Sequence, residues 1–378
     1  MSFEVAAAGA AGRDAASEQD RLRHLTDAVA AQLVASGLPR ACVPSEVGGT
    51  EAPIADVVDA VVRLAADDGA TAWCGMIAAT TSLVSGYLAP DWLEPIYGDP
   101  ASVTGGFAAP VGRATEVEGG LSVTGQWQWG SGTHHCTWIG GGALLADADG
   151  APVRRPDGLV APFVFFERQQ VELLDTWHTA GLRGTGSTDY RVEDTFVPEG
   201  RWVQVGGEPV IDRPLYRFSF FGALACGVAA VTIGLARRAI DDLADLAADK
   251  RPQGSSKPLA ERPVVQAEVA RAEGAVRSAR ALLDLAIADA TADAVAGRVD
   301  AGHRVGLRLA ATDATTRCVE AVDRCYHSAG GAAVYESSPL SRVFRDVHVA
   351  IQHAMVAPRI YEVVGRHALG LDTDLRQI

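Results

Sequence analysis

The order of helical and strand-like hydrophobic patterns along the chain limits its fold more than any single motif does. From residue 15 to about 100, apolar side chains recur every three or four positions, which is the period of an amphipathic helix. From 101 to about 205, short runs instead alternate apolar and polar residues, as half-buried strands do. From about 215 the helical period returns in long Ala-rich segments with few glycine or proline breaks.

This order predicts an α+β fold that is mostly helical. We expect an N-terminal helical domain at 1–100, a middle β-domain at 101–210 and a C-terminal helical bundle at 211–378. The β-domain should hold about six to eight strands. The segment "EGG" at 118–120 stands between two alternating runs and predicts a hairpin.

Two apolar segments bear on where the protein works. Residues 218–236 carry no charge for 19 positions, close to the length of a membrane span. The run is mostly Ala, Gly, Ser, Thr and Val and has no second span beside it, so we expect a buried helix of a soluble bundle. The N-terminal "MSFEVAAAGAAGRD" lacks a basic n-region and a long apolar core, and it predicts a loose tail rather than a signal peptide.

Composition narrows the class of partner. The chain has 33 Lys and Arg against 47 Asp and Glu, for a net charge of -14, which argues against binding nucleic acid or an anionic membrane. None of its six cysteines forms a C-x-x-C pair, so a zinc site is not expected. Six cysteines are few for this length, which indicates a reduced, cytoplasmic protein. Its nine histidines show no metal-ligand spacing, so no metal site is expected.

The segment "GQWQWGSGTHHCTWIGG" at 125–141 is the first candidate site. Ser131 stands between two glycines and close to Trp129. Its hydroxyl could satisfy backbone groups at a strand end. Alternatively, "GSG" lets the backbone approach a flat ligand closely, with Trp129 as an aromatic face beside it. His134 and His135 are adjacent, so in a strand they point to opposite faces and cannot share one metal ion.

Two later segments are also dense in unusual residues. The segment "GLRGTGSTDYRVEDTFVP" at 181–198 fits either a hairpin corner or a loop packed under a bound cofactor. In "SAGGAAVYESSPLSRVFRDVHVAIQHAM" at 328–355, "SAGG" is expected to begin a helix whose free amides suit an anion. Arg342, Arg345 and Asp346 should cluster near the start of the next helix.

Two histidines follow that cluster. His348 and His353 are five positions apart, about 140° around a helix, so they do not share one face. Each is suited either to a structural role or to solvent exposure. A histidine at such a position is also the side chain best suited to act as a general base or hydrogen-bond donor near neutral pH.

Together these segments resemble the acyl-CoA dehydrogenase superfamily over most of the chain. The matching segments are "VPSEVGG" at 43–49, "GGLSVTGQWQWGSG" at 119–132, "GLRGTGSTDYRVEDTFVP" at 181–198 and "AGGAAVYESSPLSRVFRDVHVA" at 329–350. The resemblance implies an N-terminal helical domain, a middle β-barrel or sandwich domain and a C-terminal four-helix bundle. It also implies a homotetramer, or a homodimer.

The resemblance further implies a flavin between the β-domain and the bundle. The implied cofactor contacts are Trp129, Ser131, Thr133, Arg251, Gly330 and Gly331. "WGS" matches a W-I-T segment, which puts Trp129 over the isoalloxazine and the hydroxyl of Ser131 near N5. Arg251 matches an arginine that reaches the flavin pyrophosphate across a subunit contact. The two glycines match a pair that passes close to the nucleotide end.

The departures from the dehydrogenase pattern indicate a branch. The catalytic glutamate expected nine residues after the arginine of "RD" is Ala354, preceded by His353, and the glutamate of a second subgroup is replaced by Leu224. "FAAPVGRA" replaces the usual acyl-CoA loop. Without a carboxylate base, no residue is evident to remove the α-proton of an acyl-CoA. The chain looks more like the oxygenating branch, the two-component reduced-flavin-dependent monooxygenases of group D.

That branch implies a function for the predicted catalytic residues, His353 and Ser131. A separate NAD(P)H:flavin reductase supplies FADH2 or FMNH2, and dioxygen adds to the flavin to give a C4a-hydroperoxide. Ser131 would stabilise this adduct, and His353 would deprotonate or orient a substrate O–H or N–H. The predicted reaction is hydroxylation of a small aromatic or heteroaromatic substrate of the phenol, indole or polyketide type.

Three other interpretations stay open at this point. The same oxygen adduct could oxygenate nitrogen or sulfur, as in an N-oxygenase of an amino substrate. The chain could also be an acyl-CoA dehydrogenase with a displaced base. A flavoprotein that serves only as a scaffold fits least well, because Trp129, Ser131 and His353 are all present.

Overall fold

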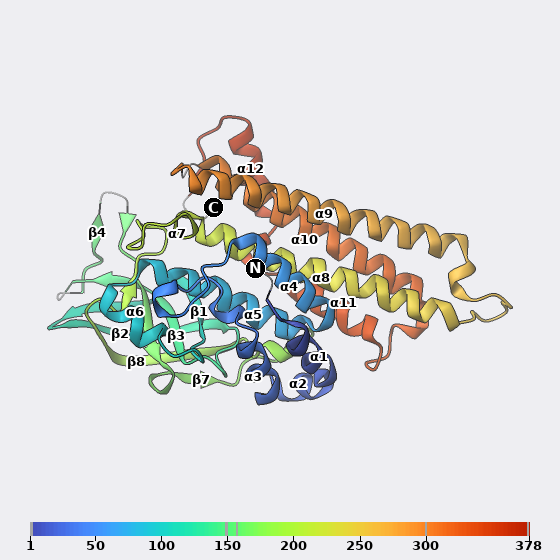
Figure 1. Ribbon diagram of the computed structural model, residues 1–378, viewed down its shortest axis with the longest axis horizontal. Helices are drawn as coiled ribbons and strands as arrows, with labels where there is room; N and C mark the ends of the chain where they lie inside the picture. Colours follow the sequence, from blue (N-terminus) through green and yellow to red (C-terminus); the bar gives the residue numbers. More distant parts are fainter. Residues whose placement is uncertain (1–2, 148–149, 156–157, 299–300, 376–377) are drawn as a thin grey trace.

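The computed structural model describes residues 3–147, 150–155, 158–298, 301–375 and 378. Its helices are α1 (Ala6–Asp14), α2 (Ala16–Leu22), α3 (Asp27–Ala35), α4 (Ile54–Asp67), α5 (Gly69–Ser82), α6 (Pro90–Tyr97), α7 (Pro214–Arg217), α8 (Phe220–Asp249), α9 (Pro263–Val295), α10 (Ala301–Ala329), α11 (Pro339–Ala350) and α12 (Arg359–Ala368). Its strands are β1 (Thr104–Val117), β2 (Gly120–Gly130), β3 (Trp138–Ala146), β4 (Arg154–Arg155), β5 (Gly158–Leu159), β6 (Phe163–Glu167), β7 (Glu172–Leu174), β8 (Thr188–Pro198) and β9 (Trp202–Val203). Helices precede and follow a central block of strands, which confirms the predicted α+β, mostly helical fold class (Figure 1).

Within the described residues, seven strands form one mixed sheet in the order β7-β8-β2-β1-β3-β6-β9. Strands β1 and β2 pair antiparallel, with Val117 opposite Gly120, so the hairpin predicted at "EGG" is confirmed. Strands β1 and β3 run parallel, and their pairing skips from Phe107 to Gly112. The intervening residues form a bulge, a feature that often redirects side chains beside a site. Strands β4 and β5 form a separate ribbon.

The core of the sheet is built around Trp127, which is fully buried. Its ring stacks on Tyr190 with 5.3 Å between ring centres and lies 5.7 Å from Phe166. Both polar tips have partners, since the indole N–H of Trp127 donates to Gly142 O at 2.8 Å and the hydroxyl of Tyr190 donates to Gly140 O at 2.5 Å. Buried aromatic rings with satisfied polar groups make a rigid support for the turn that follows β2.

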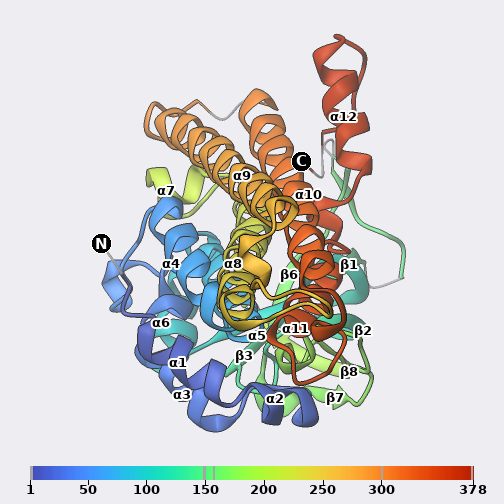
Figure 2. The same cartoon turned by 90° about the vertical axis from the view of Figure 1, so that its right-hand side faces the viewer.

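Helix α8 is the centre of the helical part of the molecule. It begins where the hydroxyl of Ser219 accepts the backbone N–H of Gly222, a typical N-cap, and it ends shortly before Pro252. Helices α4, α5, α9, α10 and α11 pack against it (Figures 1 and 2). By length and apolar composition α8 could span a membrane, but 83% of its most apolar window is buried inside the protein. The charge-free segment is therefore a buried bundle helix, as predicted.

The N-terminal segment differs from the prediction. Residues expected to form a loose tail make α1, which packs on α4 and α5. A Cβ on Gly9 would lie 2.2 Å from the Asp67 carboxylate, and one on Gly12 would lie 2.5 Å from the Thr71 hydroxyl. The helix buries itself through small residues at helical spacing rather than through large apolar ones. That close approach leaves little hydrophobic periodicity to read from the sequence.

The molecule is elongated, with the sheet and the exposed end of the bundle well separated. Figure 1 shows the sheet at one end of the long axis and the loop between α8 and α9 at the other. The link from α10 to α11 lies at that same far end. Figure 2 shows α12 standing away from the rest of the chain.

Candidate active site

Ser131 lies in a tight turn directly after β2. The N–H of Ser131 donates to Trp129 O at 2.8 Å, and the N–H of Thr133 donates to Gly130 O at 3.3 Å. Gly132 has a φ of +72°, which favours glycine, and a Cβ on Gly130 would lie 2.7 Å from the ring of Tyr190. Glycine on both sides of Ser131 therefore lets this turn form and lie against the packed sheet.

Trp129 has an unusual backbone and an open side chain. Its φ is +60°, a left-handed conformation that bulky residues rarely adopt. Its side chain is 57% exposed, and its ring meets Phe107 edge-on at 5.9 Å between centres. Strained backbone of this kind is concentrated at ligand sites. The turn thus presents an aromatic face to solvent next to the hydroxyl of Ser131.

The hydroxyl of Ser131 is buried and has two protein partners. Its residue is 5% exposed, the indole N–H of Trp73 donates to it at 3.0 Å, and the hydroxyl of Ser187 lies 2.7 Å away. Trp73 comes from α5 and Ser187 from the glycine-rich loop, residues 181–187. Residues 73–87 were expected to contribute to a pocket, but the contact of Trp73 with Ser131 was not predicted, because Trp73 lies inside an apolar helical run.

His353 also contacts Trp73, with 5.7 Å between the ring centres and 65° between the ring planes. It was expected to share a helix with His348, and that prediction is wrong. Helix α11 ends at Ala350, and His353 caps a separate 3-10 turn, Ala354–Val356. Its Nδ1 accepts the backbone N–H of Met355 at 3.2 Å, which starts the new turn. Trp73 therefore joins the two residues predicted to be catalytic.

The surroundings of His353 keep its ring neutral. Burial and the nearby guanidinium of Arg308 lower the pKa of His353 to about 4. Burial also lowers the pKa of Arg308 to about 10, so it keeps its charge at neutral pH. Arg308 is 1% exposed, and its Nε donates to Met355 O at 3.0 Å. Because Nδ1 of His353 accepts a backbone N–H, the neutral imidazole carries its proton on Nε2.

His134 and His135 were expected to lie in a strand, but they do not. The chain turns from Ser131 to His135. His134 stacks on His24 with 4.5 Å between ring centres, which joins the turn after β2 to the link between α2 and α3. Burial lowers the pKa of both His134 and His135 to about 4. In the part of the chain that the structure describes, no three His, Cys, Asp or Glu side chains are grouped to hold a metal ion.

A buried ion-pair network anchors the glycine-rich loop. Asp346 on α11 accepts the backbone N–H of Leu182 at 2.6 Å, and burial raises its pKa to about 6. Arg342 lies 3.7 Å from Asp346, 3.3 Å from Asp68 and 3.5 Å from Asp20. Arg342 and Asp346 are thus close, as the sequence indicated. One helix fixes this loop and leads directly to His353.

Thr133 has an internal partner. It is fully buried, and its hydroxyl donates to Gly130 O at 2.8 Å. This bond closes the turn around Ser131. A cofactor contact for Thr133 stays a prediction.

Arg251 lies in the loop between α8 and α9, and Gly330 and Gly331 lie in the link from α10 to α11, so both segments are at the end of the bundle away from the sheet (Figure 1). Arg251 is exposed and donates to Ser256 O in its own loop, while the neighbouring Lys250 donates to Ala329 O. The segment "SAGG" ends α10 instead of beginning a helix, so that prediction is wrong. Gly330 has a φ of +57°, the left-handed conformation in which glycine commonly ends helices.

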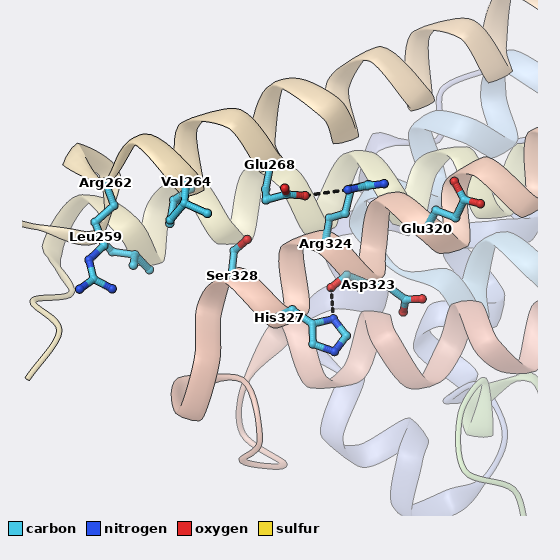
Figure 3. A pocket seen from close by; sticks show the side chains of 10 residues that line it. Leu259, Arg262, Val264, Glu268, Glu320, Asp323, Arg324, His327 and Ser328 are labelled. Atoms are coloured by element: carbon cyan, nitrogen blue, oxygen red, sulfur yellow. Dashed lines mark hydrogen bonds and ion pairs between the residues drawn. The ribbon is translucent and has the colours of Figure 1, made fainter.

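A cavity of about 570 Å³ lies between α9 and α10 near the same end (Figure 3). Glu268 and Arg324 form an ion pair of 2.8 Å in its wall, and His327 Nδ1 lies 2.7 Å from Asp323 O. The other lining residues are Leu259, Arg262, Val264, Val265, Glu320 and Ser328. Its charged wall suits a polar group better than an apolar ring. It is not the site of Ser131.

The turn after β2 has the features that a flavin ring requires. Trp129 offers an exposed aromatic face, and the backbone beside Ser131 carries no side chain on either neighbour. The hydroxyl of Ser131 can make a third hydrogen bond beyond those to Trp73 and Ser187. The residues present therefore fit a flat ring with a polar edge.

Comparison with known proteins shows which family this chain resembles. A family model described as "Acyl-CoA dehydrogenase, C-terminal domain" matches residues 226–358. The chain is 34% identical to the indole-3-acetate monooxygenase of Pseudomonas putida over 97% of this chain and 93% of that protein. It is 29% identical to the flavin-dependent monooxygenase oxygenase subunit HsaA of Rhodococcus jostii strain RHA1, over 95% of each. The structure of XiaF from a Streptomyces species with FADH2 and glycerol matches with a TM-score of 0.89, 26% identity and coverage of 97% of this chain and 94% of that one.

Proposed function

Because this chain belongs to the flavin-dependent monooxygenases of the acyl-CoA dehydrogenase fold, we propose that it hydroxylates a small aromatic or heteroaromatic compound bearing an acidic O–H or N–H. The observation that carries the proposal is the contact of Trp73 with both Ser131 and His353. A hydroxyl suited to a flavin edge and a neutral histidine suited to a substrate thus contact the same tryptophan.

Reduced flavin supplies the two electrons, so that one atom of O2 enters the substrate and the other leaves as water. We place the ring against Trp129, with Ser131 hydrogen-bonded to its polar edge near N5. The side chains of Ser131 and Trp73 are both buried, which limits the access of bulk water. Exclusion of water protects a reactive oxygen species from unproductive release of peroxide.

His353 would bind and orient the substrate rather than act as a strong base. With a pKa of about 4 it takes up a proton poorly at neutral pH, whereas its Nε2–H donates. A substrate hydroxyl that accepts this bond is held with its ring fixed. The charged Arg308 beside His353 favours negative charge on that oxygen, which makes the ring carbon more nucleophilic. A substrate N–H would need the other tautomer of the imidazole.

The nucleotide part of the flavin would be held by a second copy of the chain. Arg251 lies in the loop between α8 and α9, and Gly330 and Gly331 lie in the link from α10 to α11, at the end of the molecule away from the sheet (Figure 1). This arrangement supports a homotetramer or homodimer in which the far end of one bundle faces the β-domain of another. We also propose a separate NAD(P)H:flavin reductase as partner and a cytoplasmic location, where the six buried thiols stay reduced.

Oxygen incorporation tests the proposed function directly. The chain is loaded anaerobically with reduced FAD or FMN and mixed with labelled O2 and either indole-3-acetate or p-hydroxyphenylacetate, the compounds that relatives are named for. We expect one labelled oxygen in an aromatic product. Dehydrogenation of an acyl-CoA with an artificial electron acceptor, without oxygen incorporation, would contradict the proposal.

A further inference from the structure

Three hydroxyls form a continuous hydrogen-bonded chain that ends on Ser131. Thr185 Oγ1 lies 2.7 Å from Ser187 Oγ, which lies 2.7 Å from Ser131 Oγ. The chain starts at the carbonyl of Leu182, which lies 2.8 Å from Thr185 Oγ1. At the other end, Trp73 donates its indole N–H to Ser131 at 3.0 Å. All three hydroxyl-bearing residues are at most 5% exposed.

Counting protons shows in which direction these three hydroxyls donate their hydrogen bonds. An indole N–H can only donate and a carbonyl oxygen can only accept, so the two ends are fixed. All bonds are made at once if Trp73 donates to Ser131, Ser131 to Ser187, Ser187 to Thr185 and Thr185 to Leu182 O. In this direction Ser131 donates its single hydroxyl proton to Ser187. Only an acceptor position is left on its oxygen.

The reverse direction is less stable in the protein alone. If Ser187 donated to Ser131 instead, Thr185 would have to give up Leu182 O in order to donate to Ser187. The proton of Ser131 would then point away from both of its protein partners. Leu182 O also accepts from Thr185 N–H and the indole of Trp177, so the loss is one hydrogen bond and no orphaned carbonyl. Donation from Ser131 to Ser187 is therefore favoured by about one hydrogen bond.

We propose that Ser187 and Thr185 are specificity-determining residues, which orient Ser131 as an acceptor and thereby select the redox state of the flavin. Reduced flavin carries a proton on N5 and donates there, whereas N5 of oxidised flavin carries a lone pair and accepts. An accepting Ser131 matches the first and opposes the second. This inference rests on the proposed placement of Ser131 near N5. Neither residue needs to touch the flavin to exert the effect.

Flavin affinities in the two redox states test the proposal without measuring turnover. FAD and FMN are titrated into the intact protein by flavin fluorescence, and their reduced forms by anaerobic absorbance. Ser187→Ala removes the acceptor of the Ser131 proton, and Thr185→Val turns the proton of Ser187 back toward Ser131. Both should let Ser131 donate, so the ratio of Kd for oxidised to Kd for reduced flavin should fall about twofold to tenfold, as expected for one neutral hydrogen bond.

Conservative variants distinguish an effect of hydrogen-bond direction from a general loss of structure at the site. Ser187→Thr and Thr185→Ser keep both hydroxyls and should keep the wild-type ratio. Trp73→Phe removes a donor to Ser131, but Ser131 still donates its proton to Ser187. The preference for reduced flavin should therefore persist even if the affinities for oxidised and reduced flavin both weaken. An unchanged ratio in Ser187→Ala and Thr185→Val, in proteins that still hydroxylate substrate, would overturn the inference and leave the proposed function intact. Failure of the wild-type protein to bind reduced flavin would instead overturn the proposed function.

Discussion

The two ends of the proposed flavin site differ in how far one chain completes them. At the ring end, Ser131 is buried and bonded to partners from α5 and the glycine-rich loop. At the nucleotide end, Arg251 is exposed and bonds only to its own loop among the described contacts. The reacting groups are thus held rigidly within one chain, while the recognition of the nucleotide is left open to a second one. Each prediction below tests one side of this contrast.

The largest effect is expected at His353. His353→Ala should keep flavin binding but lower the yield of hydroxylated product about 100-fold, because the substrate loses the hydrogen bond that holds its ring in the reacting position. Product and hydrogen peroxide are measured per reduced flavin consumed. His348→Ala is the matched control, since His348 lies on α11 and pairs with Asp323. Wild-type product yield from His353→Ala would rule out the role proposed for it.

Ser131→Ala should act on coupling rather than on substrate binding. It removes the hydroxyl near the flavin edge and leaves the indole N–H of Trp73 without its acceptor. We expect about a tenfold rise in peroxide released per product formed, which corresponds to about one hydrogen bond. The same assay measures it. An unchanged ratio would mean that another group makes the contact to the flavin edge.

The ring end should also control the response to acid. The pKa of His135 is lowered to about 4 by burial, below the usual value of about 6.5. Between these values the unfolded chain takes up a proton that the folded chain refuses, so the stabilisation present above pH 6.5 is lost as the pH falls through 4. His135→Gln should flatten the loss of unfolding free energy between pH 7 and pH 5 by about 1 kcal/mol, allowing for partial exposure.

Thermal or urea unfolding at several pH values measures that slope. His367→Gln, at an exposed position of α12, is the matched control. Equal slopes for His135→Gln and the wild type would show that the protonation of His135 does not limit stability in acid.

The smallest effect is expected at the nucleotide end. Arg251→Ala should weaken the binding of FAD about threefold and the binding of FMN less, since only FAD has a pyrophosphate. Lys257→Ala, in the same loop, is the matched control because Lys257 pairs with Glu261 instead. The difference should vanish under dilution that dissociates the oligomer. Equal weakening of FAD and FMN would place Arg251 outside the pyrophosphate site.

The sequence predicted much of the fold because its signals were local. The hairpin at "EGG" and the buried helix α8 depend on neighbouring residues and were both confirmed. The errors have a common cause. Helix α1 packs through glycines that leave no apolar stripe. The break between His348 and His353 comes from the capping of a new turn by the His353 side chain, which spacing does not show.

Within the site, features that depend on neighbouring residues could be predicted from the sequence. Contacts between residues far apart in the sequence could not. The sequence alone determined that glycines flank Ser131, that Trp129 stands beside it, and that no carboxylate occupies positions 224 and 354. Only the tertiary structure decided that Trp73 meets Ser131, since 58 residues separate them, and that Ser187 meets Ser131 across 56. Periodicity and turn preferences act between near neighbours, whereas the direction of a buried hydrogen-bond chain is set by whichever donors and acceptors the packing brings together.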